Sequence, residues 1–586
     1  MKFSAALILA VGMASVGQAA DSKLAPELQN LNPDDTVDVI VQYRSAPSEA
    51  AHRKFVRRGG QLKHNFQIIR GAHYSISAGR LKELANDPDV EFIAPDRVVQ
   101  ASGDNTGPYT GNPDFGWRTA GADLATSVFG LDGSGVGIAL IDSGVDDMTD
   151  LQDANSRSRV VFKTSFIPGA DAGDAYGHGN HVAGLLAGNG SRSNVKNSTY
   201  LIRGIAPNAN LVSFKVLDSN GQGTDSAVIA AIQAAIASKN VYNIRVINLS
   251  LGRTVTTSYT KDPLCLAVQQ AWQAGIVVVV AAGNGGRDNS FGTNGYGTIN
   301  APGNSPYVIT VGAMNTVGTL PAADDKIASY TSKGPTSIDH VVKPDVVAPG
   351  NRILSTAPGN SVLEKLYPGN IPARSVYISN SNNDPSHDYF LLSGTSMATP
   401  MVAGAAALMI QKDPSLTPDQ VKARLMKTAS KFAPGYSTAT DPTTGVTYIS
   451  EYDIFTIGAG YLNITAALAN NESFTGAALS PTANYDPATQ TVLLASTSAV
   501  WGTSAIWGTS AIWGTSAIWG TSAIWGTSVF LSGSSAIWGT GAVWGTSAAW
   551  GTSTPAANSA IWGTSAIWGT GVIASDAITI AIKGDN

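Results

Sequence analysis

The sequence has few charged side chains and almost no cysteine. Lysine, arginine, aspartate and glutamate make up 13% of the 586 residues, against about 25% in ordinary soluble domains. The 37 basic and 42 acidic residues leave a net charge of −5. This charge argues against a general nucleic-acid binder, because such proteins carry a basic stripe and a high pI. Cys265 is the single cysteine, which excludes an intramolecular disulfide and any cysteine-based zinc or iron–sulfur cluster.

Long apolar runs are also missing after the N-terminus, so no later segment is predicted to span a bilayer, which needs about 20 apolar residues. A shorter run opens the chain: Lys2 precedes apolar residues 3–16, and small residues follow up to Ala19 and Ala20. This order is typical of a secretory signal peptide, whereas the run is too short for a membrane anchor. We therefore predict a signal peptide at residues 1–20 and a secreted protein, either extracellular or in the cell envelope.

The length allows about three or four domains at roughly 100 to 200 residues each, and the first covers residues 21–103. Its periodicity predicts a compact α+β domain. The expected elements are a strand at 37–43, a helix at 48–58, a strand at 72–77, a helix at 79–85 and a strand at 90–93. The polar stretch 101–114 follows, and it is typical of an exposed linker or a processing site.

Residues 115–470 alternate short apolar runs with helical segments. Apolar runs of this kind are expected of strands covered on both faces, and they lie at 136–141, 211–217, 244–249 and 276–280. Helical patterns at 226–238 and 263–274 separate them, so we predict an α/β domain whose parallel sheet has helices on both faces. A late helix is predicted to begin at Pro418, with Thr417 as its N-cap and Gln420 completing a capping box. Cys265 is expected to be a small buried hydrophobe.

The C-terminal part differs from the rest of the chain. After a predicted linker at 471–500, the hexad Trp-Gly-Thr-Ser-Ala-Ile recurs through residues 501–570, and a tail at 571–586 ends the sequence. No residue from 487 to 575 is charged. The pattern suits a stack of β-prone repeats or an aggregation-prone tail. It also suits a module that attaches to a cell surface, polymer or envelope through exposed tryptophans.

Three segments of residues 115–470 carry side chains that acyl transfer needs. Asp142 directly follows an apolar run, at the strand end where open α/β sheets place their sites. His178 and His181 begin a predicted helix without the glutamate of an HExxH motif, which disfavours a zinc site. Ser396 opens an apolar helix, whose first amides suit an oxyanion. Taken singly, such aspartates and serines are more often turn formers and caps.

The order Asp142, His178, Ser396 makes the sequence similar to the subtilisin-like serine proteases, the subtilases. The resemblance covers residues 25–470 and includes four further segments: GIAPNA at 204–209, LSLG at 249–252, AAGN at 281–284 and KPDVVAPG at 343–350. It implies a subtilisin-like sheet preceded by a ferredoxin-like inhibitory pro-domain at 21–103. It also implies a serine endopeptidase made as an autoprocessed zymogen, and we predict self-cleavage between Gln100 and Asp114.

The resemblance implies a role for each matching residue. Ser396 would attack the peptide carbonyl to form an acyl-enzyme, His178 would take and return the proton, and Asp142 would orient the imidazole ring. The side-chain amide of Asn284 and the backbone amide of Ser396 would form the oxyanion hole. His181 is expected to be a structural helix residue.

Substrate-binding residues follow from the same resemblance. An extended peptide would pair as an added strand with Ser250, Leu251 and Gly252. The primary specificity pocket would be lined by Ala282, Gly283 and Asn300. No acidic residue is evident there, so a strict preference for arginine or lysine is not predicted. One departure from the family pattern is Asn180, which replaces the usual threonine after His-Gly.

No cofactor is required for this chemistry. The resemblance allows a structural calcium ion near Asp150, but no full ligand set can be read, so metal ligands stay unknown. Expected partners are protein or peptide substrates, the chain's own pro-domain as intramolecular inhibitor and, through the repeat tail, a cell surface or polymer. A competing interpretation is a surface or adhesive protein that binds through its tail and uses the protease fold as a carrier. The presence of all catalytic positions disfavours it.

Overall fold

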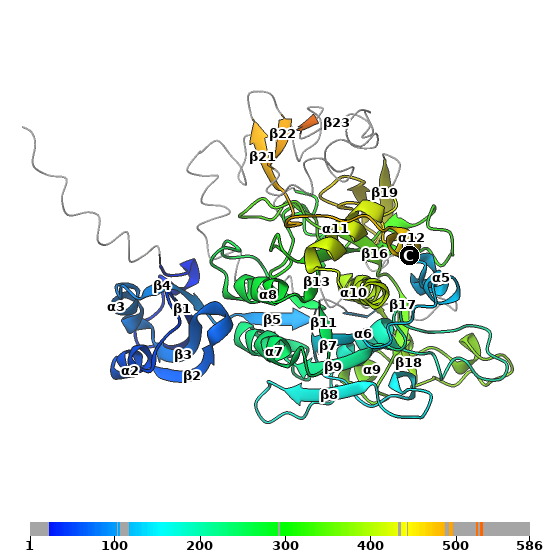
Figure 1. The fold of residues 1–586 in the computed structure, drawn as a ribbon, viewed down its shortest axis with the longest axis horizontal. Coiled ribbons are helices and arrows are strands. Elements are labelled where there is room, and N and C mark those ends of the chain that lie inside the picture. The colour runs from blue at the N-terminus through cyan, green and yellow to red at the C-terminus, as the bar shows by residue number, and fades with distance from the viewer. Residues whose placement is uncertain are drawn as a thin grey trace, which may run out of the picture.

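The computed structural model describes residues 23–101, 104–105, 116–290, 293–431, 435–441, 444–486, 491–495, 523–525 and 528–530. Figure 1 shows a small N-terminal domain beside a large α/β domain, with strand β5 (Val98–Ala101) extending from the small domain between two helices of the large one. The predicted signal peptide lies outside the described residues. Across the described part of the chain, no helix is long and apolar enough to cross a membrane.

The N-terminal domain has the order βαββαβ and an antiparallel sheet in the order β2-β3-β1-β4, which is the ferredoxin-like arrangement. Its main elements are β1 (Thr36–Tyr43), α2 (Glu49–Arg57), β2 (Gln61–Phe66), β3 (Gly71–Ser77), α3 (Leu81–Ala85) and β4 (Val90–Pro95). Apolar side chains from both layers, among them Val41, Phe55 and Tyr74, form its core. The expected elements are present, but β2 was not predicted because most of its side chains are polar and exposed.

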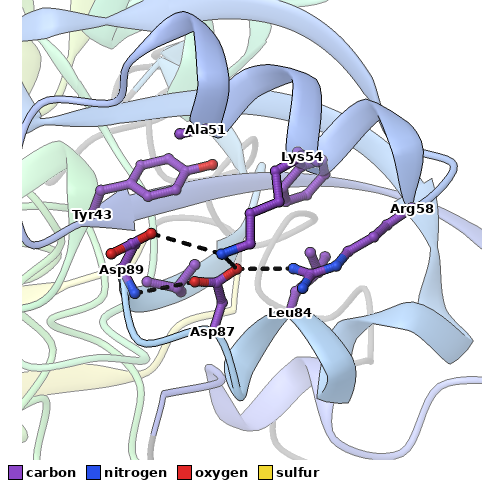
Figure 2. Close-up of a pocket in the computed structure, with 9 residues that line it drawn as sticks. Tyr43, Ala51, Lys54, Arg58, Leu84, Asp87 and Asp89 are labelled. Carbon is purple, nitrogen blue, oxygen red and sulfur yellow. Dashed lines mark hydrogen bonds and ion pairs between the residues drawn. The ribbon is translucent and has the colours of Figure 1, made fainter.

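A small pocket in this domain is filled by ion pairs (Figure 2). Lys54 Nζ lies 2.5 Å and Arg58 Nη1 3.0 Å from Asp87 Oδ2, so helix α2 is tied to the turn before β4. Burial would raise the pKa of Asp87, but hydrogen bonds from Lys54, Asp89 and Arg58 lower it below the usual value. The charged side chains of this pocket are already paired with one another, which gives the pocket a structural role.

The large domain is built on one sheet in the order β15-β14-β13-β11-β7-β9-β8, with β16 pairing to β14. All these pairs are parallel except the one made by β15. The four predicted strands are β7 (Gly137–Asp142), β9 (Asn210–Lys215), β11 (Ile244–Leu249) and β13 (Val277–Ala281). The sheet adds β8 (Val160–Ser165), β14 (Ile309–Asn315), β15 (Lys326–Ile327) and β16 (Val346–Pro349). The α/β sheet expected from the apolar runs is thus confirmed.

Helices cover both faces of this sheet (Figure 1). The helices α7 (Asp225–Ser238) and α8 (Pro263–Gln273) pack against each other, as do α6 (His178–Ala187) and α10 (Thr395–Lys412). Helix α11 (Pro418–Thr428) begins with the predicted capping box of Thr417 and Gln420. Cys265 is buried in α8 as expected, and its Sγ donates to Asn304 Oδ1 at 3.1 Å.

The connection between the domains differs from the exposed linker predicted from Ala101 onward. Strand β5 is paired on both sides, with β10 (Gln222–Thr224) and with β12 (Leu251–Gly252). Asp104–Asn105 then form β6, which pairs with β18 (Tyr389–Ser393). The backbone of Ala101 and of Asp104–Asn105 is thus paired by edge strands of the large domain, which composition does not reveal. The rest of the stretch predicted as a linker or processing site lies outside the described residues.

The large domain also continues beyond the boundary predicted at residue 470. Ser480 is buried, accepts a hydrogen bond from Lys422 Nζ at 2.8 Å and donates to Asp345 Oδ1 at 2.6 Å. The predicted linker 471–500 contains β21 (Thr482–Asp486) and β22 (Thr491–Ala495), which form a sheet with β23 (Ala523–Trp525) and β24 (Ser528–Phe530). Apart from β23 and β24, the predicted repeat and tail regions lie outside the described residues.

Replacing Ser480 tests this extended boundary. Ser480→Ala leaves the buried Lys422 ammonium and Asp345 carboxylate each without one partner, so we expect the free energy of unfolding to fall by about 1 to 3 kcal/mol. Urea unfolding of the chain in a Ser396→Ala background measures the change without self-digestion. Ser415→Ala, at an exposed serine, is the control and should leave the midpoint unchanged. An equal midpoint for both variants would place Ser480 outside the folded domain.

Candidate active site

Three predicted catalytic residues lie at the ends of elements of the large domain. Asp142 is the last residue of β7, His178 is the first residue of α6, and Ser396 is in the first turn of α10. All three side chains are buried. Gly177, directly before His178, has φ 106°, and a Cβ there would lie 2.5 Å from Ser361 Oγ. Only glycine fits this sharp entry into α6.

Asp142 and His178 form a direct hydrogen-bonded pair. The distance between His178 Nδ1 and Asp142 Oδ1 is 2.7 Å. The backbone amide of Ser143 also donates to Asp142 Oδ1 at 2.7 Å. Because an ionised carboxylate only accepts hydrogen bonds, this contact fixes the proton on Nδ1 and the lone pair of the neutral imidazole on Nε2. This is the tautomer that a general base needs.

Ser396 is held by reciprocal contacts with Ser250. Ser396 Oγ donates to the carbonyl oxygen of Ser250 at 2.9 Å, and Ser250 Oγ donates to the carbonyl oxygen of Ser396 at 2.9 Å. The first turn of α10 is thereby tied to the end of β11. Helix α10 also packs directly on α6, the helix that carries His178.

A buried aspartate that the sequence analysis did not single out organises the start of α6. Asp174 accepts hydrogen bonds from Ser143 Oγ at 2.7 Å, from the Gly177 amide at 2.8 Å and from the Asn180 amide at 2.7 Å. Ser143 Oγ in turn accepts from the Gly179 amide at 2.8 Å. Burial raises the pKa of Asp174 to about 6 despite these hydrogen bonds. This network fixes the loop after Asp142 against the helix of His178, and the position of Asp174 shortly before Gly177 was its only sequence signal.

The two remaining polar residues of the His178 helix have structural contacts. Asn180, the departure from the family pattern, accepts at Oδ1 from the Asp146 amide at 2.8 Å. His181 Nε2 lies 3.0 Å from the carbonyl oxygen of Ile353 and 3.1 Å from that of Phe390. Burial lowers the pKa of His181 to about 3, so the ring is neutral. This geometry agrees with the structural role expected for His181.

Asn284 lies beside the start of α10. Its Oδ1 accepts from the amide and the hydroxyl of Thr395, both at 3.0 Å, and Thr395 directly precedes Ser396. The Thr395 hydroxyl also accepts from the Gly283 amide at 3.2 Å. Two donors of Thr395 thus fix the position of Oδ1. Its role in an oxyanion hole stays a prediction.

The residues predicted to bind substrate also come together. A Cβ on Gly283, which has φ 107°, would lie 2.9 Å from Cγ and Nδ2 of Asn300, and a Cβ on Gly252 would lie 3.1 Å from Asn300 Cβ. The amide of Asn300 donates to the carbonyl oxygen of buried Ala282 at 2.9 Å. Leu251 and Gly252 already pair with a strand, β5. The structure therefore groups these residues, while their part in binding substrate stays a prediction.

Asp150, near which the resemblance allows a structural calcium ion, has protein donors on both carboxylate oxygens, and the calcium ion stays an expectation. Its carboxylate is buried and accepts from the Tyr389 hydroxyl at 2.7 Å and from the Arg192 amide at 2.7 Å. Burial raises its pKa despite these hydrogen bonds. Each oxygen of Asp150 thus already accepts one hydrogen bond. Within the described ranges, no group of three or more His, Cys, Asp or Glu side chains is arranged to hold a metal ion.

A buried aspartate–histidine pair, Asp142 and His178, and a serine at the start of a helix, Ser396, lie in one parallel α/β domain, an arrangement typical of serine hydrolases. The sequence profile of the subtilase family matches residues 133–452, more than half of the chain. The chain therefore belongs to the subtilase family, and this membership makes it a serine-type endopeptidase.

Individual relatives agree with this assignment. Serine protease AprX of Bacillus subtilis (strain 168) is 38% identical over 312 residues, which cover 52% of this chain and 63% of that protein, less than two thirds of its length. Subtilisin E of the same organism is 33% identical over 392 residues, or 66% of this chain and 83% of that protein. Fervidolysin from Fervidobacterium pennivorans, described as a keratinolytic enzyme related to subtilisin, has a TM-score of 0.54 at 21% identity. The match covers 77% of this chain and 63% of the fervidolysin chain, and this likeness supports the fold alone.

Proposed function

We propose that this protein is a secreted endopeptidase that cleaves peptide bonds through Asp142, His178 and Ser396. The observation that carries the proposal is the 2.7 Å contact between His178 Nδ1 and Asp142 Oδ1. With the lone pair on Nε2, His178 takes the proton of Ser396 Oγ as that oxygen attacks the peptide carbonyl. The same proton then goes to the leaving amine, and water releases the acyl group by the reverse sequence. Asp142 stabilises the imidazolium formed in each half of the reaction.

The negative charge that develops on the carbonyl oxygen needs donors placed before the reaction. We assign this role to Nδ2 of Asn284 and the backbone amide of Ser396. Asn284 is suited to it because Thr395 fixes the orientation of its side chain through Oδ1.

Removing this amide tests the assignment. We expect Asn284→Ala to lower kcat by about 100- to 1000-fold and to change KM little, since the donor acts on the transition state. Steady-state hydrolysis of a fluorogenic peptide separates the two constants. Thr395→Val removes one contact to Oδ1 but keeps the Nδ2 donor, so it should cost far less. Equal losses in both variants would show that Asn284 only supports α10.

Substrates are proposed to bind as β5 does, as an extended strand between β10 and β12. Strand β5 pairs Gln100 with Gly252 and Ala101 with Leu251. The carbonyl oxygen of Ser250, next to Leu251, contacts Ser396 Oγ. A peptide in this register therefore reaches the nucleophile just after the residue that pairs with Leu251. The pocket of Ala282, Gly283 and Asn300 would receive the side chain beside the scissile bond.

The N-terminal domain is proposed to be an inhibitory pro-domain, because its own strand β5 occupies the proposed substrate groove. The predicted self-cleavage between Gln100 and Asp114 fits this register, and the pairing of Ala101 with Leu251 favours the start of that interval. N-terminal sequencing of the purified active enzyme tests this proposal. A first residue between 101 and 114 supports it, and a mature chain that still begins before Val98 would contradict it.

A further inference from the structure

A buried cluster of charges lies beside the proposed substrate groove. Arg253, which follows β12, donates from Nε and Nη2 to the two oxygens of Asp225 at 2.8 Å each. Its Nη2 also contacts both oxygens of Asp262, at 2.9 and 2.7 Å. Asp225 is the first residue of α7 and Asp262 is the N-cap of α8. The large domain therefore contributes two carboxylates and one guanidinium, with a net charge of −1.

A second guanidinium, supplied by the N-terminal domain, occupies this cluster. The carbonyl oxygen of Arg97 accepts from the Asp225 amide at 2.8 Å, which continues the pairing of β5 with β10 by one residue. Arg97 Nη2 donates to Thr257 Oγ1 at 3.1 Å, and Nη1 lies 3.8 Å from Asp262 Oδ2. Arg97 Nε binds Glu27 of the N-terminal domain at 2.9 Å. The side chain of Arg97 is 8% exposed and those of Asp225 and Asp262 are 0% exposed.

Removal of the N-terminal domain changes the charge balance of this cluster. Arg97 and Glu27 leave together, and Asp225, Asp262, Arg253 and Thr257 remain. Burial would raise the pKa of Asp262, but the positive charges of Arg253 and Arg97 lower it below the usual value. The remaining cluster holds one more carboxylate than guanidinium beside a groove that accepts extended strands. A buried charge without a full set of partners is costly, so a cation that enters is favoured.

We propose that Asp225, Asp262 and Thr257 form a subsite for a basic substrate side chain, arginine above all. The subsite takes the residue three positions before the one that pairs with Gly252, the place that Arg97 holds in the uncut chain. The inference rests on the proposed endopeptidase function and on the strand register of substrates. It is separate from the primary specificity pocket, where no acidic side chain was found in the sequence.

Arginine suits this subsite better than other side chains. One nitrogen of its planar fork donates to Thr257 while another lies within ion-pair distance of Asp262, as in Arg97, and the backbone of the same residue pairs with the Asp225 amide. Lysine supplies the charge but a single donor group, and a neutral side chain leaves the excess carboxylate unpaired. A glutamate at this position would add a third carboxylate to the cluster.

The test compares internally quenched peptides with the sequence of residues 95–106. One carries arginine at the position of Arg97, and its partners carry citrulline, the neutral isostere of arginine, or glutamate. With processed wild-type enzyme, kcat/KM for the arginine peptide should exceed that of the citrulline peptide by at least about tenfold, since close buried charge pairs contribute about 1.5 kcal/mol or more. The glutamate peptide should be cleaved more slowly still.

A shorter peptide of residues 99–106 separates the two proposals, because it does not reach the subsite. Cleavage of the short peptide together with an arginine-to-citrulline ratio near one would overturn the subsite alone. Failure to cleave any peptide would overturn the proposed function and the subsite together. A ratio above tenfold supports both.

Enzyme variants assign the preference to the cluster. Asp262→Asn keeps the cap of α8 but removes a charge, and it should bring the arginine-to-citrulline ratio close to one. Thr257→Val should lower the ratio several-fold and is the milder substitution if Asp262→Asn folds poorly. Asp384→Asn, which removes an exposed charge elsewhere, is the control and should keep the wild-type ratio. A wild-type ratio in both Asp262→Asn and Thr257→Val would overturn the subsite.

Discussion

Protein carrying Ser396→Ala is expected to accumulate as an uncut chain that still contains the N-terminal domain, and to hydrolyse no casein. Ser396 Oγ is the proposed nucleophile, and no other group in the site replaces an alkoxide formed beside His178. Loss of the triad serine costs about 10⁶-fold in kcat in subtilisin, and we expect a loss of that size here. Denaturing gels and intact mass follow the cut, and casein hydrolysis follows the activity.

Two controls make this result decisive. Wild-type protein from the same host should lose the N-terminal domain during purification. A trace of processed wild-type enzyme should cut the Ser396→Ala chain in trans within the 100–114 interval, which shows that the variant is folded and its cleavage site accessible. A Ser396→Ala chain that is cut as readily as wild type without added enzyme would refute self-cleavage. Remaining casein hydrolysis by this variant would refute Ser396 as the nucleophile.

The second large effect is expected from Asp142→Asn. The asparagine keeps the size of the side chain but can donate a hydrogen bond to Nδ1 of His178, which moves the imidazole proton to Nε2 and removes the base. We expect kcat to fall by about 10⁴-fold while KM changes little. The measurement is fluorogenic peptide hydrolysis after the N-terminal domain has been clipped in trans and the helper enzyme removed.

A matched variant controls for the loss of a charge in the same loop. Asp147 is exposed, lies five residues after Asp142 and pairs with Lys163 at 3.4 Å. Asp147→Asn should retain nearly full activity. If Asp142→Asn lost no more activity than Asp147→Asn, the 2.7 Å contact between Asp142 and His178 would have no catalytic role.

The strands of the sheet centre could be predicted because both of their faces are buried. β7, β11 and β13 are mostly apolar runs, and their ends fell within one residue of the prediction. β8 was missed because Val160 is its only buried residue and Val161 and Lys163 are exposed. The pairing of β5 and β6 was missed because their partners are edge strands distant in the sequence.

The residues of the candidate site also fall into those that the sequence revealed and those that only the structure revealed. Asp142, His178 and Ser396 were identified because each lies in a short segment of distinctive composition. Asp174 and Thr395 were missed because their importance depends on contacts across the fold, with Ser143 and with Asn284. Arg97 and Asp262 are far apart in the sequence, and only the docking of the N-terminal domain brings them together.

Covalent labelling of Ser396 tests the central claim most directly. Processed protein would be treated with a fluorophosphonate, digested and mapped by tandem mass spectrometry, with heat-denatured protein as the control. We predict a single stoichiometric adduct on Ser396 in the folded protein, no adduct after denaturation, and loss of casein hydrolysis in step with labelling. An unlabelled Ser396 in folded, processed protein, or full labelling with activity retained, would contradict the account.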